Sequence, residues 1–424
     1  MDTRFVSLLV FCVLVTWCKA DVPAEMLSFG GECRLRGEAL DNALDLTDHG
    51  DTTSEGISRN DAYEYLRFRT RMWFKASPQP GLAMFFRLGN EYRFGRGANT
   101  SGMKDPESKV SLDNAWARIS RRSVALTFGR MDLLYGEGFL IFDGTPADGS
   151  SSAWFDAVKL SLARPIGAVD FIFAKIDEEG FGGPSRDEDL VGVYGVRGKA
   201  ETYLLHRTKR SSTGSLSGTV RSQGTTTAAG ARIARQPSHG VSYAAEGAYQ
   251  WGDVGSESRR GYGGYGRIGW RGAGRAGLGV ECGGLYLSGD DPSTDRHEGW
   301  DGFYGEWPKY SELLVYTLYD NTTRVTPNEP GTWTNMAAFW LEAGVAVPGG
   351  GRLVARITPL RAAEKGTGPG SGTYRGLLVA ARADARLAEG LQAQVLGEVF
   401  TPGDFYADDA DVALYGRWQL TASF

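Results

Sequence analysis

Basic side chains recur at every second position in one stretch of the chain, residues 62–76, and could bind anions. One parity of this stretch carries Arg67, Arg69, Arg71 and Lys75, and the other carries Leu66, Phe68, Thr70, Met72 and Phe74. A guanidinium stays charged at any accessible pH, so this column must face water, anions or carboxylates. The chemistry it offers is the charge-assisted hydrogen bond to a carboxylate.

A two-residue period is typical of a β-strand whose two faces lie in unlike surroundings. Two architectures explain it. In a soluble sandwich the uncharged face is the core and the arginines face bulk solvent. In an outer-membrane barrel the apolar face meets lipid and the arginines line the interior. Arg or Lys on the lipid face costs about 2–4 kcal/mol near the bilayer midplane, so in a barrel Arg67, Arg69 and Arg71 must point inward.

The chain has 424 residues, 59 glycines and a formal net charge of −5. Residues 1–20 have the pattern of a secretory signal, with Arg4 before an apolar run and Ala20 before the expected cleavage point. No later apolar run is long enough for a spanning helix, which excludes a helical membrane protein but not a barrel. Cys33 and Cys282, the two cysteines in 21–424, are too few for a disulfide framework and are expected to be buried or lipid-facing thiols.

Long and short connections alternate along the chain and favour the barrel. The long ones fall at 39–61, 95–111, 132–153, 177–188 and 208–224, and short turns separate them. Counting segments gives about eighteen strands in one antiparallel barrel over 21–424. We expect short periplasmic turns, long extracellular loops and both chain ends on the short-turn side. Residues 288–332 are expected to form a long extracellular loop, either a lid or a local aromatic core.

The last strand has the features of an insertion signal for outer-membrane barrels. It alternates and ends in a terminal aromatic residue, and we expect Trp418, Leu420 and Phe424 to be recognised by the insertion machinery.

Parity also sorts the charged residues of the other expected strands. The inward cations are predicted to be Arg34, Arg36, Arg67, Arg69, Arg71, Lys75, Arg87, Arg93, Arg118, Lys159, Arg356, Arg382, Arg386 and Arg417. The inward acids are fewer, namely Glu32, Glu64 or Glu91, Glu246, Asp384 and Glu398. One interpretation is that the charges pair across neighbouring strands and stiffen the wall. The other is that surplus cations in a confined bore raise the local anion concentration.

Several segments resemble the alginate-export family of outer-membrane barrels. They are 128–130, 135–137, 154–160, 288–291, 307–313 and 400–406, and their order spans most of residues 21–424. The resemblance implies an eighteen-stranded barrel with a cationic lumen that passes an anionic uronate polymer. It also implies that Arg67, Arg69, Arg118 and Arg130 belong to the selectivity lining. Asp156 is predicted to be among the balancing carboxylates.

Other chemistry is weaker in this sequence. Asp404, Asp408 and Asp409 are candidate oxygen ligands for a structural Ca²⁺, with a solvated loop as the alternative. A G-x-G-x-x-G match at 261–266 lacks a strand-to-helix context. An outer-membrane acyl hydrolase would need a Ser–His pair on the outer face, and His206, the one histidine in an expected strand, has no evident serine partner.

The sequence therefore predicts a monomeric outer-membrane channel with no enzymatic activity. Its partners would be outer-membrane lipid, the insertion machinery and an anionic saccharide, and not nucleic acid. The arginines would offer transient hydrogen bonds to carboxylates of an alginate-like polymer or anionic oligosaccharides. A general anion-selective porin for small solutes is the alternative, and a plugged barrel for adhesion or scaffolding is a third hypothesis.

Overall fold

The computed structural model describes residues 26–43, 46, 62–97, 110–142, 155–177, 187–209, 224–274, 277–305, 311–314, 334–365 and 370–424. For residues 63, 92–97, 177 and 187 it describes the backbone alone. The expected signal segment lies outside these ranges and stays a prediction.

Nineteen strands form one sheet within the described residues. They are β1 (Leu27–Asp41), β2 (Tyr63–Gln79), β3 (Leu82–Gly97), β4 (Ser111–Arg121), β5 (Val124–Met131), β6 (Phe155–Arg164), β7 (Gly167–Asp177), β8 (Asp187–Arg197), β9 (Ala200–Lys209), β10 (Gly224–Arg235), β11 (Gly240–Val254), β12 (Glu257–Arg271), β13 (Gly279–Leu287), β14 (Arg296–His297), β15 (Met336–Val347), β16 (Gly351–Arg361), β17 (Tyr374–Ala388), β18 (Leu391–Pro402) and β19 (Ala413–Ser423). No helix in the described part of the chain is long and apolar enough to cross a bilayer.

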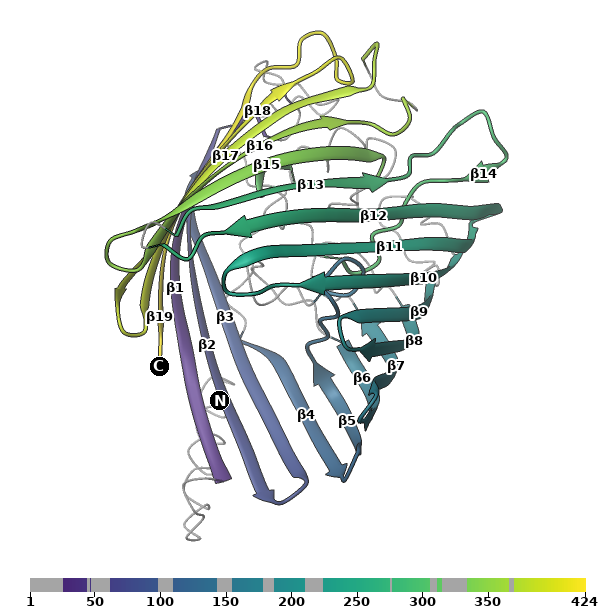
Figure 1. Ribbon diagram of the computed structural model, residues 1–424, viewed down its shortest axis with the longest axis vertical. Helices are drawn as coiled ribbons and strands as arrows, with labels where there is room; N and C mark the ends of the chain where they lie inside the picture. Colours follow the sequence, from purple (N-terminus) through teal and green to yellow (C-terminus); the bar gives the residue numbers. More distant parts are fainter. Residues whose placement is uncertain are drawn as a thin grey trace, which may run out of the picture.

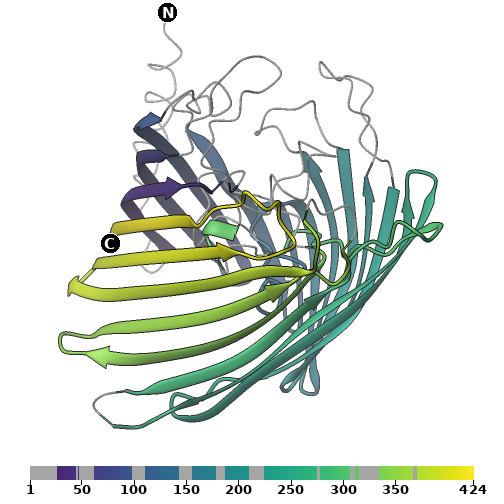
Figure 2. The same ribbon diagram turned by 90° about the horizontal axis from the view of Figure 1, so that it is seen from above.

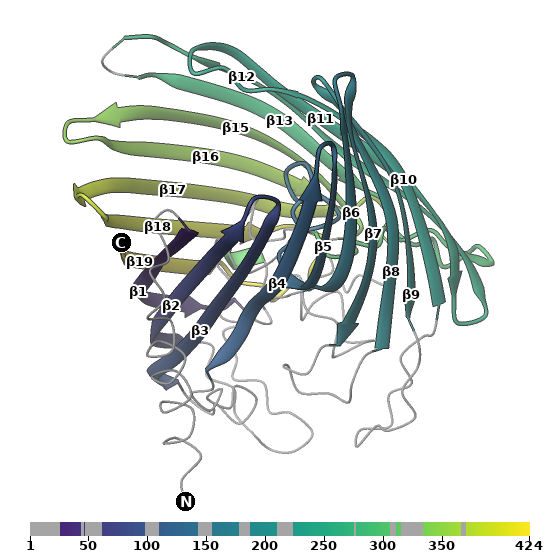
Figure 3. The same cartoon turned by 90° about the horizontal axis from the view of Figure 1, so that it is seen from below.

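The sheet closes on itself, because β1 pairs antiparallel with both β2 and β19. The two-residue β14 lies in the connection between β13 and β15 and pairs parallel with β12. The other eighteen strands follow one another around an antiparallel barrel, which confirms the predicted fold (Figure 1). The view from above shows the strands surrounding the interior, and the view from below shows β1 beside β19 (Figures 2 and 3).

The two faces of each strand differ as the sequence predicts. In β2, Leu66 and Met72 are exposed on the outer face, whereas Arg67, Arg69 and Arg71 are buried on the inner face. Apolar residues alternate outward in the same way on β7, β8, β15 and β18. Cys33 is exposed on the outward parity of β1, in agreement with the expected lipid-facing thiol.

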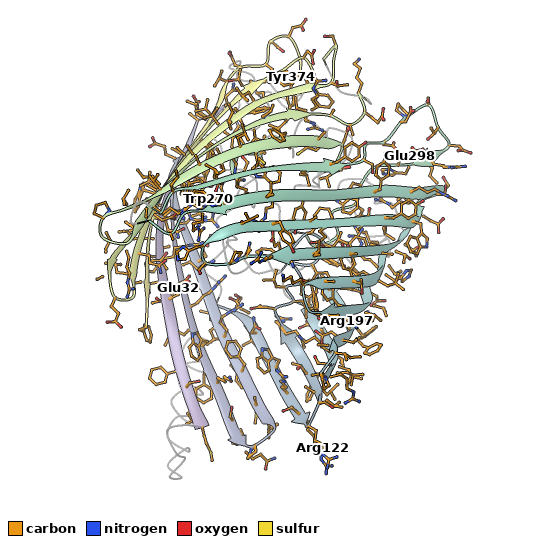
Figure 4. All side chains as sticks on the ribbon, in the orientation of Figure 1. Glu32, Arg122, Arg197, Trp270, Glu298 and Tyr374 are labelled. Carbon is orange, nitrogen blue, oxygen red and sulfur yellow. The ribbon has the colours of Figure 1, made fainter. Side chains whose placement is uncertain are left out.

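Both ends of the described chain lie at the short-turn end of the barrel. Leu27 is opposite Ala76 beside the β2–β3 turn, and Ala422 is opposite Leu391 beside the β17–β18 turn. Arg122 in the β4–β5 turn and Glu298 in the long β13–β15 connection lie far apart in Figure 4. One connection departs from the expected alternation, because 255–256, on the long-loop side, is a two-residue turn.

The carboxy-terminal strand places its apolar residues on the lipid face. Trp418 and Leu420 are partly exposed there, and Phe424 is 75% exposed. The backbone of Phe424 exchanges two hydrogen bonds of 3.2 Å with Gly31, which fixes the terminus against β1. A Cβ at Gly37 would lie 2.3 Å from the Trp418 indole nitrogen, so the ring lies directly over this glycine. The geometry suits an insertion signal, whose recognition stays a prediction.

Candidate functional site

The predicted arginine column is assembled from two neighbouring strands, β1 and β2. Arg34 is opposite Arg69 and Arg36 is opposite Arg67 in the antiparallel register. Like charges directly opposite one another are destabilising unless other groups compensate them. All four side chains are nevertheless buried, with Arg34 1% and Arg36 0% exposed. The wall must therefore supply carboxylates close to these guanidinium groups.

Three glutamates supply that compensation. Glu38 lies 3.1 Å from both Arg36 and Arg67. Glu91 accepts from Arg67 Nε at 3.0 Å and lies 3.4 Å from Arg34 Nη2. Glu32 accepts from Arg69 Nη2 at 2.6 Å. Apart from Arg36–Glu38 within β1, these ion pairs join residues of neighbouring or next-neighbouring strands, so the charges tie β1, β2 and β3 together.

Two aspartates continue the network toward β4 and the segment after β5. The register of β3 and β4 shifts between Arg87 and Leu88, and the extra residue is Asp113. Asp113 is buried, 3.5 Å from Arg71 Nε and 3.7 Å from Arg87 Nε. Asp132 accepts two bonds from Arg87, at 2.8 and 3.0 Å, and one from Asn114 at 2.6 Å.

The structure therefore supports the paired-wall interpretation for this column. Glu32 and Glu91, predicted as balancing carboxylates, pair with these arginines, whereas Glu38, Asp113 and Asp132 were not among the predicted inward acids. Arg34 and Arg36 have almost no surface, so they are not placed to meet a solute. Their measurable role is in holding the wall together.

Arg130 and Asp156 do not belong to the lumen, which corrects the place that the resemblance implied for Arg130 and the predicted role of Asp156 as a balancing carboxylate. They are opposite each other in the β5–β6 register, next to the exposed pair Phe128 and Val158 two residues along each strand. Alternation places both charges on the same outward face. They form a bidentate pair with two bonds of 2.8 Å at the long-loop end of the barrel, where an outward charge costs little.

The remaining predicted cations face inward with their own partners. Arg356 binds Glu342 at 2.7 Å, Arg382 binds the predicted Asp384 at 3.0 Å, and Lys159 Nζ lies 3.9 Å from Asp170. Arg417 binds Glu312 at 2.7 Å and Gln394 at 2.6 Å. The side chain of Arg93 lies outside the described part of the structure.

Three inward cations differ from all of these. Lys75, Arg118 and Arg386 share the inward parity of β2, β4 and β17 and are exposed. Within the described residues none of them forms an ion pair or a side-chain hydrogen bond. All three lie near short turns, so unpaired positive charge gathers at the short-turn end of the bore.

At the opposite end, two connecting segments fold back into the barrel instead of projecting outward. Tyr135 stacks on Tyr194 of β8 at 4.3 Å, and Glu137 bridges Arg232 and Arg267 at 3.0 and 2.7 Å. Phe139 stacks on Trp300 of the second segment at 5.1 Å. The long connection predicted at 132–153 is present between β5 and β6, and its described part, 132–142, folds into the barrel.

The second segment, 299–305, is fixed by Asp301. Its carboxylate pairs with Arg207 of β9 and lies 3.3 Å from Arg259 of β12. Gln250 bonds both the backbone N–H and the carbonyl of Asp301, at 2.9 and 2.6 Å. Burial raises the pKa of the Asp301 carboxyl, but Arg207 and Arg259 lower it by more, so the net pKa lies well below its ordinary value. We call this contact the Asp301 latch.

Residues 311–314 also contact the inner wall. Glu398 of β18 accepts hydrogen bonds from the Ser311 hydroxyl, at 2.5 Å, and from the Leu313 N–H, at 3.0 Å. The predicted carboxylate Glu398 thus anchors a loop, and its role as a balancing charge is secondary. Within 288–332, where the sequence predicted an extracellular loop with a lid or a local aromatic core, residues 299–305 and 311–314 pack against the inner wall. Residues 290–297 form a largely exposed turn beside the start of β12.

Other predicted features are also placed. Asp404 Oδ1 accepts from the Tyr374 N–H at 2.8 Å, and the described residues contain no group of three acidic, His or Cys side chains that could hold a metal ion. His206 lies on the outward parity of β9, with its Nδ1 2.9 Å from the Thr227 hydroxyl.

A comparison with known families agrees with this geometry. A family model described as alginate export matches residues 25–419. The chain belongs to the alginate export family. The matched residues run from just before β1 to within β19, the last strand of the barrel. No curated protein matched the chain in a separate search.

Solved outer-membrane porins share the fold of this alginate export family member. Pseudomonas aeruginosa OccK3 (OpdO) is 11% identical over 94% of this chain and 96% of its own, with a TM-score of 0.55. Acinetobacter baumannii OccAB2 is 9% identical over 94% and 98%, with a TM-score of 0.58. Pseudomonas aeruginosa OccK2 (OpdF), solved in complex with glucuronate, is 9% identical over 94% and 96%, with a TM-score of 0.56. At these identities the likeness shows the fold alone.

Proposed function

We propose that this barrel is a passive outer-membrane channel for anionic saccharides, an alginate-like uronate polymer or its oligomers. Membership of the alginate export family supports solute passage through the barrel. The observation that carries the anionic class is the set of exposed inward cations without acidic partners, Lys75, Arg118 and Arg386. Fixed positive charge in a confined bore raises the local concentration of anions.

This proposal changes where selectivity resides. The buried arginines of β1 and β2 are paired with Glu32, Glu38, Glu91 and Asp113, so they hold the wall in shape. The unpaired cations at the short-turn end meet the solute and supply weak, exchangeable contacts to carboxylates. Weak binding at several sites is what conduction requires. A porin of the same fold has been solved with glucuronate, which is a single uronate ring.

The double variant Lys75→Gln plus Arg118→Gln should lower the anion-to-cation permeability ratio several-fold. Each charge contributes on the order of 1 kcal/mol of attraction to an anion at close range in water. Reversal potentials across planar bilayers under a salt gradient measure the ratio. Arg130→Gln is the matched control, because that arginine faces outward, and its selectivity should equal wild type.

Solute class is tested in the same bilayers. Oligouronates added to the chamber should block the current transiently, whereas neutral oligosaccharides of the same length should block it less. An unchanged permeability ratio in the double variant, or a cation-selective wild type, would contradict the proposal. Anion selectivity without any oligouronate block would instead favour a porin for small anions.

A further inference from the structure

Three aromatic rings from successive strands form a continuous row on the inner wall. The rings belong to Trp73 of β2, Phe85 of β3 and Trp116 of β4. Phe85 is opposite Trp116 in the β3–β4 register, and Trp73 lies two residues from the position opposite Phe85 on β2. The ring centroids of Trp73 and Phe85 are 6.1 Å apart at 22°, and those of Phe85 and Trp116 are 5.4 Å apart at 19°. The rings are therefore nearly parallel, and we call them the aromatic row.

The row faces the bore, not the lipid. Trp73 follows Arg71 at a two-residue spacing, and Phe85 precedes Arg87 at the same spacing, so both share the inward parity. A Cβ at Gly30 of β1 would lie 2.6 Å from the Trp73 ring, so this ring spreads over the neighbouring strand on the inner side. An aromatic girdle at a membrane interface would face outward. The row needs another explanation.

The three rings are only partly buried, and two of them carry polar groups available to a ligand. Neither the Trp73 nor the Trp116 indole N–H forms a hydrogen bond within the described residues, and neither is sealed off from solvent. A buried Trp usually finds a partner for this donor. An accessible ring face with a free donor at its edge is suited to a ligand that has both an apolar face and hydroxyl groups.

Two of the unpaired cations flank the row. Lys75 is opposite Phe85 in the β2–β3 register, and Arg118 follows Trp116 on the same face of β4. Arg118 lies on the short-turn side of the rings, and Lys75 is level with Phe85 and Trp116. Toward the other end the row meets the paired groups Arg71, Arg87 and Asp113. The aromatic row thus lies between exposed positive charge and the neutralised part of the wall.

We propose that the aromatic row, with Lys75 and Arg118, is a binding subsite for a uronate ring of the passing saccharide. The C–H face of the sugar stacks on Trp73 and Trp116, the indole N–H groups donate to its hydroxyls, and its carboxylate meets the flanking cations. Stacking alone would accept a neutral sugar, and the cations select the acidic one. This inference rests on the proposed function and specifies the ligand class and the place where it binds.

The double variant Trp73→Ala plus Trp116→Ala tests the subsite through single-channel block by an oligouronate of defined length. Loss of the two stacking contacts should weaken the block about three- to tenfold. The reversal potential for chloride salts should stay at the wild-type value, because no charge is removed. Trp270→Ala, which deletes an exposed tryptophan on the outward parity of β12, is the matched control and should leave the block unchanged.

The outcomes separate the subsite from the function on which it rests. Heat-modifiable migration on gels establishes first that each variant forms the barrel. If oligouronates block the tryptophan double variant as strongly as wild type, the subsite is overturned and the proposed channel function is unaffected. Absence of block in the wild type would overturn the saccharide function itself. Equal weakening for a neutral oligosaccharide would show that the row lacks selectivity for uronates.

Discussion

Replacing Asp301 by alanine should release residues 299–305 from the barrel wall and increase the single-channel conductance. The Asp301 carboxylate lies between two wall arginines, Arg207 and Arg259, and its backbone is held by Gln250. Arg207 also lies under the rings of Phe303 and Tyr304, at 4.7 and 5.7 Å from their centroids. Removal of one partner from a buried ion pair typically costs about 3–5 kcal/mol, which is enough to detach a short segment.

The measurement combines conductance in planar bilayers with limited proteolysis of the folded barrel. Asp301→Ala should conduct more and be cleaved within the released segment, and Asp301→Asn should behave similarly because it lacks the charge. Asp291→Ala is the control in the same connection, since the Asp291 carboxylate accepts a bond from the Ser293 N–H in an exposed turn and does not contact the barrel wall within the described residues. Wild-type conductance and protease resistance in Asp301→Ala would show that the segment is held by its aromatic contacts instead.

The latch should also persist as the pH falls. Burial raises the pKa of Asp301, but Arg207 and Arg259 lower it by a larger amount. The folded-state pKa therefore lies below that of the unfolded chain. A carboxyl group whose pKa is lowered by folding stabilises the protein at pH values above its unfolded-state pKa. That stability is lost only as the pH falls through the folded-state pKa. Wild-type conductance should therefore not rise between neutral pH and about pH 4 through release of this segment. A rise in that interval that Asp301→Ala abolishes would contradict the assignment.

The sequence was sufficient to predict the barrel because the two-residue period of a strand is visible in that strand alone, without knowledge of its neighbours. Leu66, Arg67 and Met72 occupy the faces that alternation predicts. The expected eighteen barrel strands are confirmed, and both ends of the described chain lie at the short-turn end. Arg130 shows the limit of an assignment made by resemblance. Its own parity with Phe128 places it outward, and the periodicity was the better guide.

What the sequence could not supply is the pairing of charges across the closed sheet. Glu38 is on the polar parity of β1, but nothing local indicates that it lies beside Arg67 of the next strand. Asp113 points inward because of a register shift, and single-sequence parity is blind to such a shift. Asp301 pairs with Arg207, which lies 94 positions earlier in the sequence. Fold follows from local alternation here, whereas the balance of lumenal charge follows from contacts between distant parts of the chain.

Replacing Glu38 by alanine should destabilise the barrel more than removal of an exposed lumenal carboxylate. Glu38 accepts from Arg67 Nη1 and Arg36 Nη1 at 3.1 Å and from the Tyr415 hydroxyl at 3.2 Å. All of these groups are buried, so water cannot replace the lost negative charge. We expect Glu38→Ala to lose about 3–5 kcal/mol in the free energy of unfolding. The stability of Glu38→Gln should fall between those of Glu38→Ala and wild type.

Glu342→Ala is the matched control for this effect. Glu342 also pairs with one lumenal arginine, Arg356 at 2.7 Å, but both side chains are about one-fifth exposed, at 23% and 22%. Partly hydrated pairs contribute about 0–1 kcal/mol, so this variant should unfold close to wild type in a urea titration of the barrel in lipid vesicles. Equal effects of Glu38→Ala and Glu342→Ala would mean that water reaches the β1–β2 arginines. In that case those arginines, and not only the cations near the short turns, would be free to select the solute.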